Sequence, residues 1–167
     1  YPGSSGSTNA TGTAARFRNP RGITTDGTNL YVVDSSNHMI RKIVISTGAV
    51  TTLAGSTSHG STDGTGTSAK FSNPREISTD GANLYVADKD NHKIRKIVIA
   101  TGVVTTIAGS GSSGSTDATG TAASFSSPMG IAIDGTNIYV GDYSNHKIRK
   151  IGLRGTVTAD VALHNLD

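Results

Sequence analysis

The sequence lacks cysteine and tryptophan altogether, and its 167 residues include only three phenylalanines and five tyrosines. The absence of cysteine excludes disulfides, thiolate metal sites and cysteine nucleophiles. The absence of tryptophan counts against a surface that stacks sugar rings or nucleic-acid bases. No stretch approaches the roughly 18 apolar residues of a membrane helix, so no membrane partner is expected. The 21 glycines and many serines and threonines separate short, regular apolar runs, which indicate thin β-structure.

Charge is equally modest. The formal net charge is +3, and the basic residues recur at fixed intervals instead of forming one run. This pattern gives little support to nucleic acid as a partner. The chain starts at Tyr1 with no signal peptide in view, which fits a processed product or a fragment. Together with the composition, this predicts an extracellular or periplasmic protein.

The dominant feature is an internal repeat of 54 residues. The copies Gly12–Thr65 and Gly66–Thr119 are identical at 38 of 54 aligned positions, and a third copy runs from Gly120 to Ile151 before it diverges. The recurring positions include Phe17, Phe71 and Phe125; Pro20, Pro74 and Pro128; Asp34, Asp88 and Asp142; Asn37, Asn91 and Asn145; and His38, His92 and His146. A repeat of this length indicates an architecture built from three similar units.

Each copy predicts four short strands joined by tight turns, because β-branched residues dominate and no stripe of helical period survives the glycines. In the first copy these strands cover residues 22–25, 30–33, 39–45 and 50–54. Asp26-Gly27 and Thr47-Gly48 are the turn signals. The fourth strand of the third copy is predicted at Thr156–Ala159. The connector of about nineteen residues before Asn73 is expected to form a surface loop with Phe71 as its apolar anchor.

A four-stranded meander is too thin to bury both of its faces, whereas repeated meanders stack around an axis as the blades of a propeller. The predicted fold is therefore an all-β β-propeller with three four-stranded antiparallel blades, half of a six-bladed ring. The predicted organisation is a lead-in over 1–22, blade 1 with its connector over 23–65, blade 2 with its connector over 66–119, and blade 3 over 120–167.

The repeated motif resembles the NHL repeat, named for an Asn-His-Leu pattern. It is carried by the segments Asn19–Ile23, Asn29–Asp34 and Asn37–Ile43 and by their counterparts 54 residues on. The position after Asn-His is Met39, Lys93 or Lys147 instead of leucine. The resemblance implies a β-propeller, most often six-bladed, that serves as a platform for protein or RNA; a minority of such propellers are enzymes, among them a metal-dependent lyase.

Three blades are too few for a closed ring, since propellers have about four to eight. An open arc leaves two bare faces and exposed strand edges, which favour association. The expected partner is a second copy, closing a six-bladed ring by homodimerisation. The rival is that the remaining blades belong to a longer chain. A protein ligand of unknown identity is also expected.

The repeated histidines and aspartates are the first candidates for chemistry. Three histidines could hold zinc, and an Asp–His pair could orient a catalytic base. Both patterns keep the repeat symmetry, whereas a catalytic site breaks it, so structural roles in the turns are predicted. The set predicted to be structural comprises Asp34, Asn37, His38, Asp88, Asn91, His92, Asp142, Asn145 and His146. No catalytic residue, metal ligand or cofactor is predicted.

The loops Ser61–Gly64 and Ser115–Asp117 each offer one carboxylate, too few for calcium, and are predicted to be turns. His59 has no counterpart in the other copies and is read as incidental.

Basic residues form the candidate ligand surface. The residues assigned to it are Arg21, Arg75, Arg41, Arg95, Arg149 and the turn aromatic Tyr143. A basic propeller face can bind RNA phosphates. The predicted function is a non-enzymatic scaffold for protein binding or self-assembly, with an RNA platform or a metal-dependent lyase fragment as alternatives.

Overall fold

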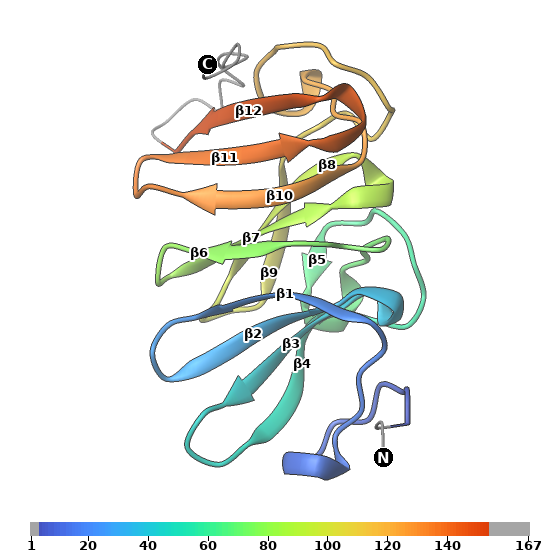
Figure 1. Ribbon diagram of the computed structural model, residues 1–167, viewed down its shortest axis with the longest axis vertical. Coiled ribbons are helices and arrows are strands. Elements are labelled where there is room, and N and C mark those ends of the chain that lie inside the picture. The colour runs from blue at the N-terminus through green and yellow to red at the C-terminus, as the bar shows by residue number, and fades with distance from the viewer. Residues whose placement is uncertain (1–3, 154–167) are drawn as a thin grey trace.

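The computed structural model describes residues 4–153 and contains three antiparallel sheets that follow one another in chain order (Figure 1). The prediction of an all-β fold is confirmed. The first sheet has the order β1 (Pro20–Thr25), β2 (Asn29–Asp34), β3 (Met39–Val44) and β4 (Ala49–Gly55). Among the described residues, no helix is long and apolar enough to span a membrane.

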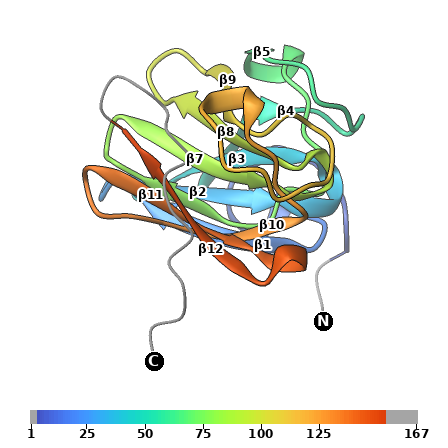
Figure 2. The ribbon, with the colours of Figure 1, turned by 90° about the horizontal axis from the view of Figure 1, so that it is seen from above.

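The other two sheets repeat this meander. The second has the order β6 (Ile77–Thr79), β7 (Asn83–Asp88), β8 (Lys93–Val98) and β9 (Val103–Ala108), with the short β5 (Gly64–Thr65) added beside β9. The third contains β10 (Pro128–Ile133), β11 (Asn137–Asp142) and β12 (Lys147–Gly152). Its predicted fourth strand, Thr156–Ala159, lies outside the described residues. Seen from above, β1 and β10 lie on one side of the molecule and β4, β5 and β9 on the opposite side (Figure 2).

Each unit also contains short 3-10 turns. Three of them join the second and third strands: η2 (Ser35–Asn37), η4 (Lys89–Asn91) and η6 (Tyr143–Asn145). The other three lie in the segments that lead into each sheet: η1 (Gly12–Ala14), η3 (Gly66–Ser68) and η5 (Gly120–Ala122).

The Asp-Gly signals form the predicted turns. The carboxylate of Asp26 accepts the N–H groups of Thr28 at 2.8 Å and Asn29 at 2.6 Å, and the phenol of Tyr31 at 2.7 Å. The bonds from the Asn29 backbone and side chain and from Tyr31 hold the pKa of Asp26 well below its usual 3.8. Burial, with the neighbouring Asp26, raises the pKa of Tyr31 to about 12.

The long connectors belong to the sheet that follows them. Strand β5 pairs with β9, with Gly64 opposite Val104, and Thr11 forms a bridge with Ala49 of β4. Residues 64–65, assigned from sequence to the connector of blade 1, therefore extend the sheet of blade 2.

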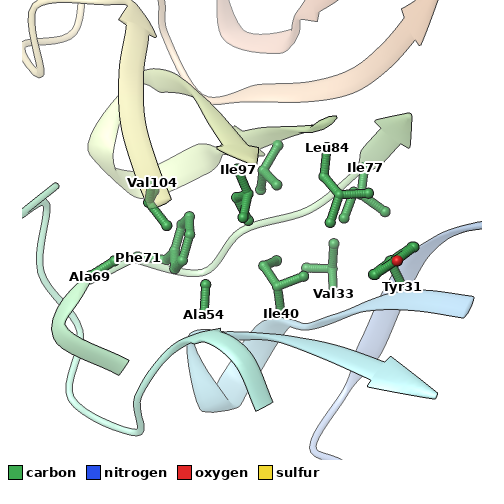
Figure 3. Close-up of a cluster of buried hydrophobic side chains, with 11 residues drawn as sticks. Tyr31, Val33, Ile40, Ala54, Ala69, Phe71, Ile77, Leu84, Ile97 and Val104 are labelled. Carbon is green, nitrogen blue, oxygen red and sulfur yellow. The ribbon is translucent and has the colours of Figure 1, made fainter. Parts of the chain in front are cut away.

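The buried apolar side chains of the core lie between neighbouring sheets. One buried cluster is formed by Tyr31, Val33, Ile40 and Ala54 of the first unit and by Ala69, Phe71, Ile77, Leu84, Val86, Ile97 and Val104 of the second (Figure 3). The predicted anchor Phe71 has no exposed surface. A second cluster joins the second and third units in the same way. Each sheet thus has a forward face, turned toward the following sheet, and a rear face, turned toward the preceding one.

Candidate functional site

A buried ion pair occupies the same place in every sheet. Asp34 ends β2 and meets Arg41 of β3 at 2.7 Å, with both side chains fully buried. The equivalent pairs are Asp88–Arg95 at 2.8 Å and Asp142–Arg149 at 2.9 Å. Buried charges are tolerated only when they are paired and hydrogen-bonded, so the rest of each network matters as much as the pair.

Each buried carboxylate receives two further donors. Asn37 donates through Nδ2 to Asp34 at 2.8 Å and to the carbonyl of Gly6 at 2.7 Å, and the N–H of Arg18 donates to the other oxygen of Asp34 at 2.7 Å. Asn91 and Asn145 repeat this arrangement. Burial raises the pKa of the Asp88 carboxyl to about 6, against the opposing effect of the hydrogen bonds and of the neighbouring arginine.

The arginine of each pair binds the lead-in segment of its own unit. The guanidinium of Arg41 donates to the carbonyls of Arg16 at 3.0 Å and Thr8 at 3.1 Å and to Oδ1 of Asn9 at 2.7 Å. It also lies 4.9 Å from the centre of the Phe17 ring, within cation–π range. These contacts fix a Gly/Ser/Thr-rich segment that has little apolar surface of its own.

The second and third units replace Asn9 by a carboxylate. Asp63 accepts from Arg95 at 2.7 Å, and Asp117 lies 2.5 Å from Arg149. Burial acts to raise the pKa of Asp63, but hydrogen bonds from Thr106 and the nearby Arg95 lower it overall. Sequence reasoning treated both carboxylates as loop residues; their spacing of 54, with Asn9 in the equivalent position, was the available signal.

The assignment of Arg41, Arg95 and Arg149 to a ligand surface was wrong. Their exposed fractions are 0%, 0% and 1%, because each is enclosed between the sheet and its lead-in segment. Of the predicted surface set, Arg21 is exposed, Arg75 is half-buried and Tyr143 is 62% exposed.

Two of the three repeated histidines lie between neighbouring sheets. His38 has a left-handed backbone with φ of 57°, and its Nδ1 accepts the N–H of Asn73 of the second unit at 3.1 Å. His92 accepts the N–H of Ser127 of the third unit at 3.0 Å. His38 and His92 thus each bond the next unit instead of converging on a common point, and residues 4–153 contain no cluster of three potential metal ligands.

His59 also contacts this region. Its ring lies 5.8 Å from that of His38. Burial, followed by the nearby His59, lowers the pKa of His38, which favours the neutral imidazole needed to accept a hydrogen bond.

Within residues 4–153, the outer faces of the first and third sheets have no further sheet packed against them. On the forward face, Ile40 and Ile94 are fully buried, whereas their counterpart Ile148 is 48% exposed. On the rear face, Ile77 is 3% exposed, whereas its counterpart Ile23 is 57% exposed. Ile148 and Ile23 are thus open at the two ends, although Ile40, Ile94 and Ile77 are buried at the internal junctions.

Comparison with known proteins agrees with the repeat motif, although no protein-family model matches the chain. The human protein NHL repeat-containing protein 2 is 33% identical over 155 residues, covering 83% of this chain and 21% of the relative. The chain belongs to the NHL-repeat family of β-propellers. It spans about a fifth of the length of that NHL relative.

Solved structures also superimpose on this chain. An auxiliary nutrient binding protein from Bacteroides thetaiotaomicron superimposes with a TM-score of 0.66 at 26% identity, over 83% of this chain and 37% of the other. Virginiamycin B lyase from Staphylococcus aureus gives a TM-score of 0.53 at 18% identity, over 81% and 39% of the two chains. The likeness to the lyase shows the fold alone.

Proposed function

We propose that this chain is a non-enzymatic NHL propeller module that binds protein through its open blade faces, and that its partner is a second copy completing a six-bladed ring. The observation that carries this proposal is the contrast between matched positions. Ile40 and Ile94 are buried against a following blade, and Ile148 is half exposed with none after it in the described chain. An apolar position that is buried wherever a neighbour exists favours a neighbour here also.

The absence of an enzymatic role is proposed on the symmetry of the polar network. The candidate Asp side chains make the same structural bonds in each unit, and His38 and His92 make equivalent bonds to the following unit, so these side chains are committed to structural contacts. Arg21, Arg75 and Tyr143 remain available for a ligand, but burial of three of the six predicted surface residues weakens the RNA alternative. An extracellular or periplasmic location stays a prediction, which fractionation of the source cells would test.

Light scattering coupled to size-exclusion chromatography tests the proposal directly. The chain has a mass of 17.1 kDa, and twice that mass is expected over a range of concentrations. A single-chain mass at every concentration, with native circular dichroism, would refute ring closure by two copies.

A further inference from the structure

The internal junctions define what a neighbouring blade contributes. At both of them a histidine accepts a backbone N–H from the residue before the proline of the next unit. At the first junction, Gly22 also donates its N–H to the carbonyl of Arg75 at 2.9 Å. Apolar forward-face and rear-face side chains fill the space between the sheets. Each junction is therefore directional: the forward face supplies the imidazole, and the rear face supplies the N–H.

The third blade holds the acceptor half of such a junction. His146 has the same left-handed conformation as the other two histidines, with φ of 54°, and it is exposed. It flanks Ile148, which lies on the open forward face. No hydrogen bond from another described residue reaches the imidazole of His146, whereas His38 and His92 each have one.

The first blade holds the donor half. Asn19 precedes Pro20 and has φ of 50°, matching Asn73 at 45° and Ser127 at 52°. A left-handed conformation before proline is unfavourable for a non-glycine residue, so it requires compensation from its surroundings. At Asn73 and Ser127 that compensation includes the bond to histidine. Within residues 4–153 the N–H of Asn19 has no acceptor, although the backbone of Asn19 has the same left-handed conformation.

A glycine supports the same register. A Cβ on Gly22 would lie 2.8 Å from the Cα of Glu76, so the approach of the second blade requires glycine there. Gly130 is its counterpart in the third blade, and a Cβ there would meet nothing closer than 3.9 Å. The described chain gives no steric reason for glycine at position 130, whereas the approach of another blade in the same register would provide one.

We infer that the rear face of the first blade of a second copy docks on the forward face of the third blade, in the register of the first internal junction. His146 Nδ1 accepts the N–H of Asn19 of the second copy, and the N–H of Gly130 donates to the carbonyl of its Arg21. This inference rests on the proposed ring closure and specifies its contacts. The two-fold ring contains this junction twice, because each copy supplies one forward face and one rear face.

Two charge substitutions test the faces separately. Ile148→Asp and Ile23→Asp each place a carboxylate in both junctions of a homodimer, so each is expected to raise the dimer Kd at least about 100-fold. A mixture of the two variants can form a heterodimer in which one junction has native faces on both sides. Mixing is therefore expected to restore part of the dimer, which only a directional, two-face contact predicts. Val103→Asp, at an exposed apolar position of the middle blade, is the matched control and should leave the dimer intact.

The histidine bond has its own test. His146→Asn retains a residue that tolerates the left-handed conformation but shortens the side chain. The loss of one hydrogen bond is expected to weaken each junction about fivefold, and hence to raise the dimer Kd roughly 25-fold. His59→Asn, in an exposed loop of the same protein, should leave the Kd unchanged.

The outcomes separate this inference from the proposed function. A wild-type chain that stays at one-chain mass overturns both. A wild-type dimer that is insensitive to Ile148→Asp, Ile23→Asp and His146→Asn leaves self-assembly standing and refutes this interface. A dimer that is lost in either single-face variant and regained on mixing supports it.

Discussion

Replacing Arg95 by methionine is expected to destabilise the protein strongly. The substitution removes the counter-charge of Asp88, whose side chain is fully buried, but it retains apolar volume at the site. Removing one partner of a buried pair costs about 3–5 kcal/mol, because the remaining charge is left desolvated. The bonds to the carbonyls of Lys70 and Thr62 and to Asp63 are lost as well.

The size of the effect sets the measurement. A loss of about 4 kcal/mol corresponds to a fall in Tm of roughly 8–16 °C for a protein of this length. Urea denaturation followed by circular dichroism gives the free energy of unfolding, at a protein concentration where the assembly state is known. Lys96→Met, at the next position of β8 and only half-buried, is the control and should change stability by less than about 0.5 kcal/mol.

A second substitution tests the reason for the loss. Asp88→Asn should destabilise the wild type, because it weakens a paired, hydrogen-bonded carboxylate. In the Arg95→Met background it should instead restore about 1–2 kcal/mol, because it removes the unpaired buried charge. A loss below about 1 kcal/mol for Arg95→Met, or a further loss on adding Asp88→Asn, would refute the reasoning.

Three further predictions follow from local geometry. Gly22→Ala should cost about 1–3 kcal/mol by thermal denaturation, since its Cβ would meet the Glu76 backbone, whereas Gly130→Ala should cost less than 0.5 kcal/mol in a chain held monomeric by dilution. Because the pKa of Tyr31 is raised in the folded state, its contribution to stability is fully present below pH 10 and is lost as pH rises through about 12. Tyr31→Phe should therefore reduce the fall in unfolding free energy at alkaline pH, and an unchanged alkaline pH dependence would contradict this prediction. The lowered pKa of Asp26 contributes stability above pH 3.8 that is lost as pH falls through its folded value, so Asp26→Asn should reduce the acid dependence in urea titrations.

The sequence was sufficient for the repeat, the main strands of each unit and the turns, but not for β5. A step of 54 residues aligned each Asp-Gly signal with a turn, and the dominance of β-branched residues indicated the strands. Burial was harder to predict. Phe71 was correctly expected to be an apolar anchor, but Arg41 was assigned to the surface because arginine is rarely buried without a partner. Its partner, Asp34, is visible only once η2 and the hairpin register bring the ends of β2 and β3 together.

The histidine contacts could be predicted only partly from the sequence. A structural role in the turn followed from the symmetry of the repeat. The partner of His38 is a backbone N–H 35 residues further on, and a backbone group leaves no mark in the sequence. The connector posed the same difficulty, since its Gly/Ser/Thr composition is typical of a linker, yet Arg95 orders it through the carbonyls of Thr62 and Lys70.

These buried networks bear on why the forward face of the last sheet and the rear face of the first sheet are complementary. Because each arginine binds the lead-in segment of its own unit, the Asp–Arg network of every unit forms without a contribution from a neighbour. The contacts that both junctions share are the packing of apolar faces and the bond to histidine, and the first junction adds the bond from Gly22 to Arg75. The described part of the chain therefore has a forward face on its third sheet and a rear face on its first sheet that pack against no other described sheet. Closing the ring with a second copy then requires no surface that the chain does not already use internally.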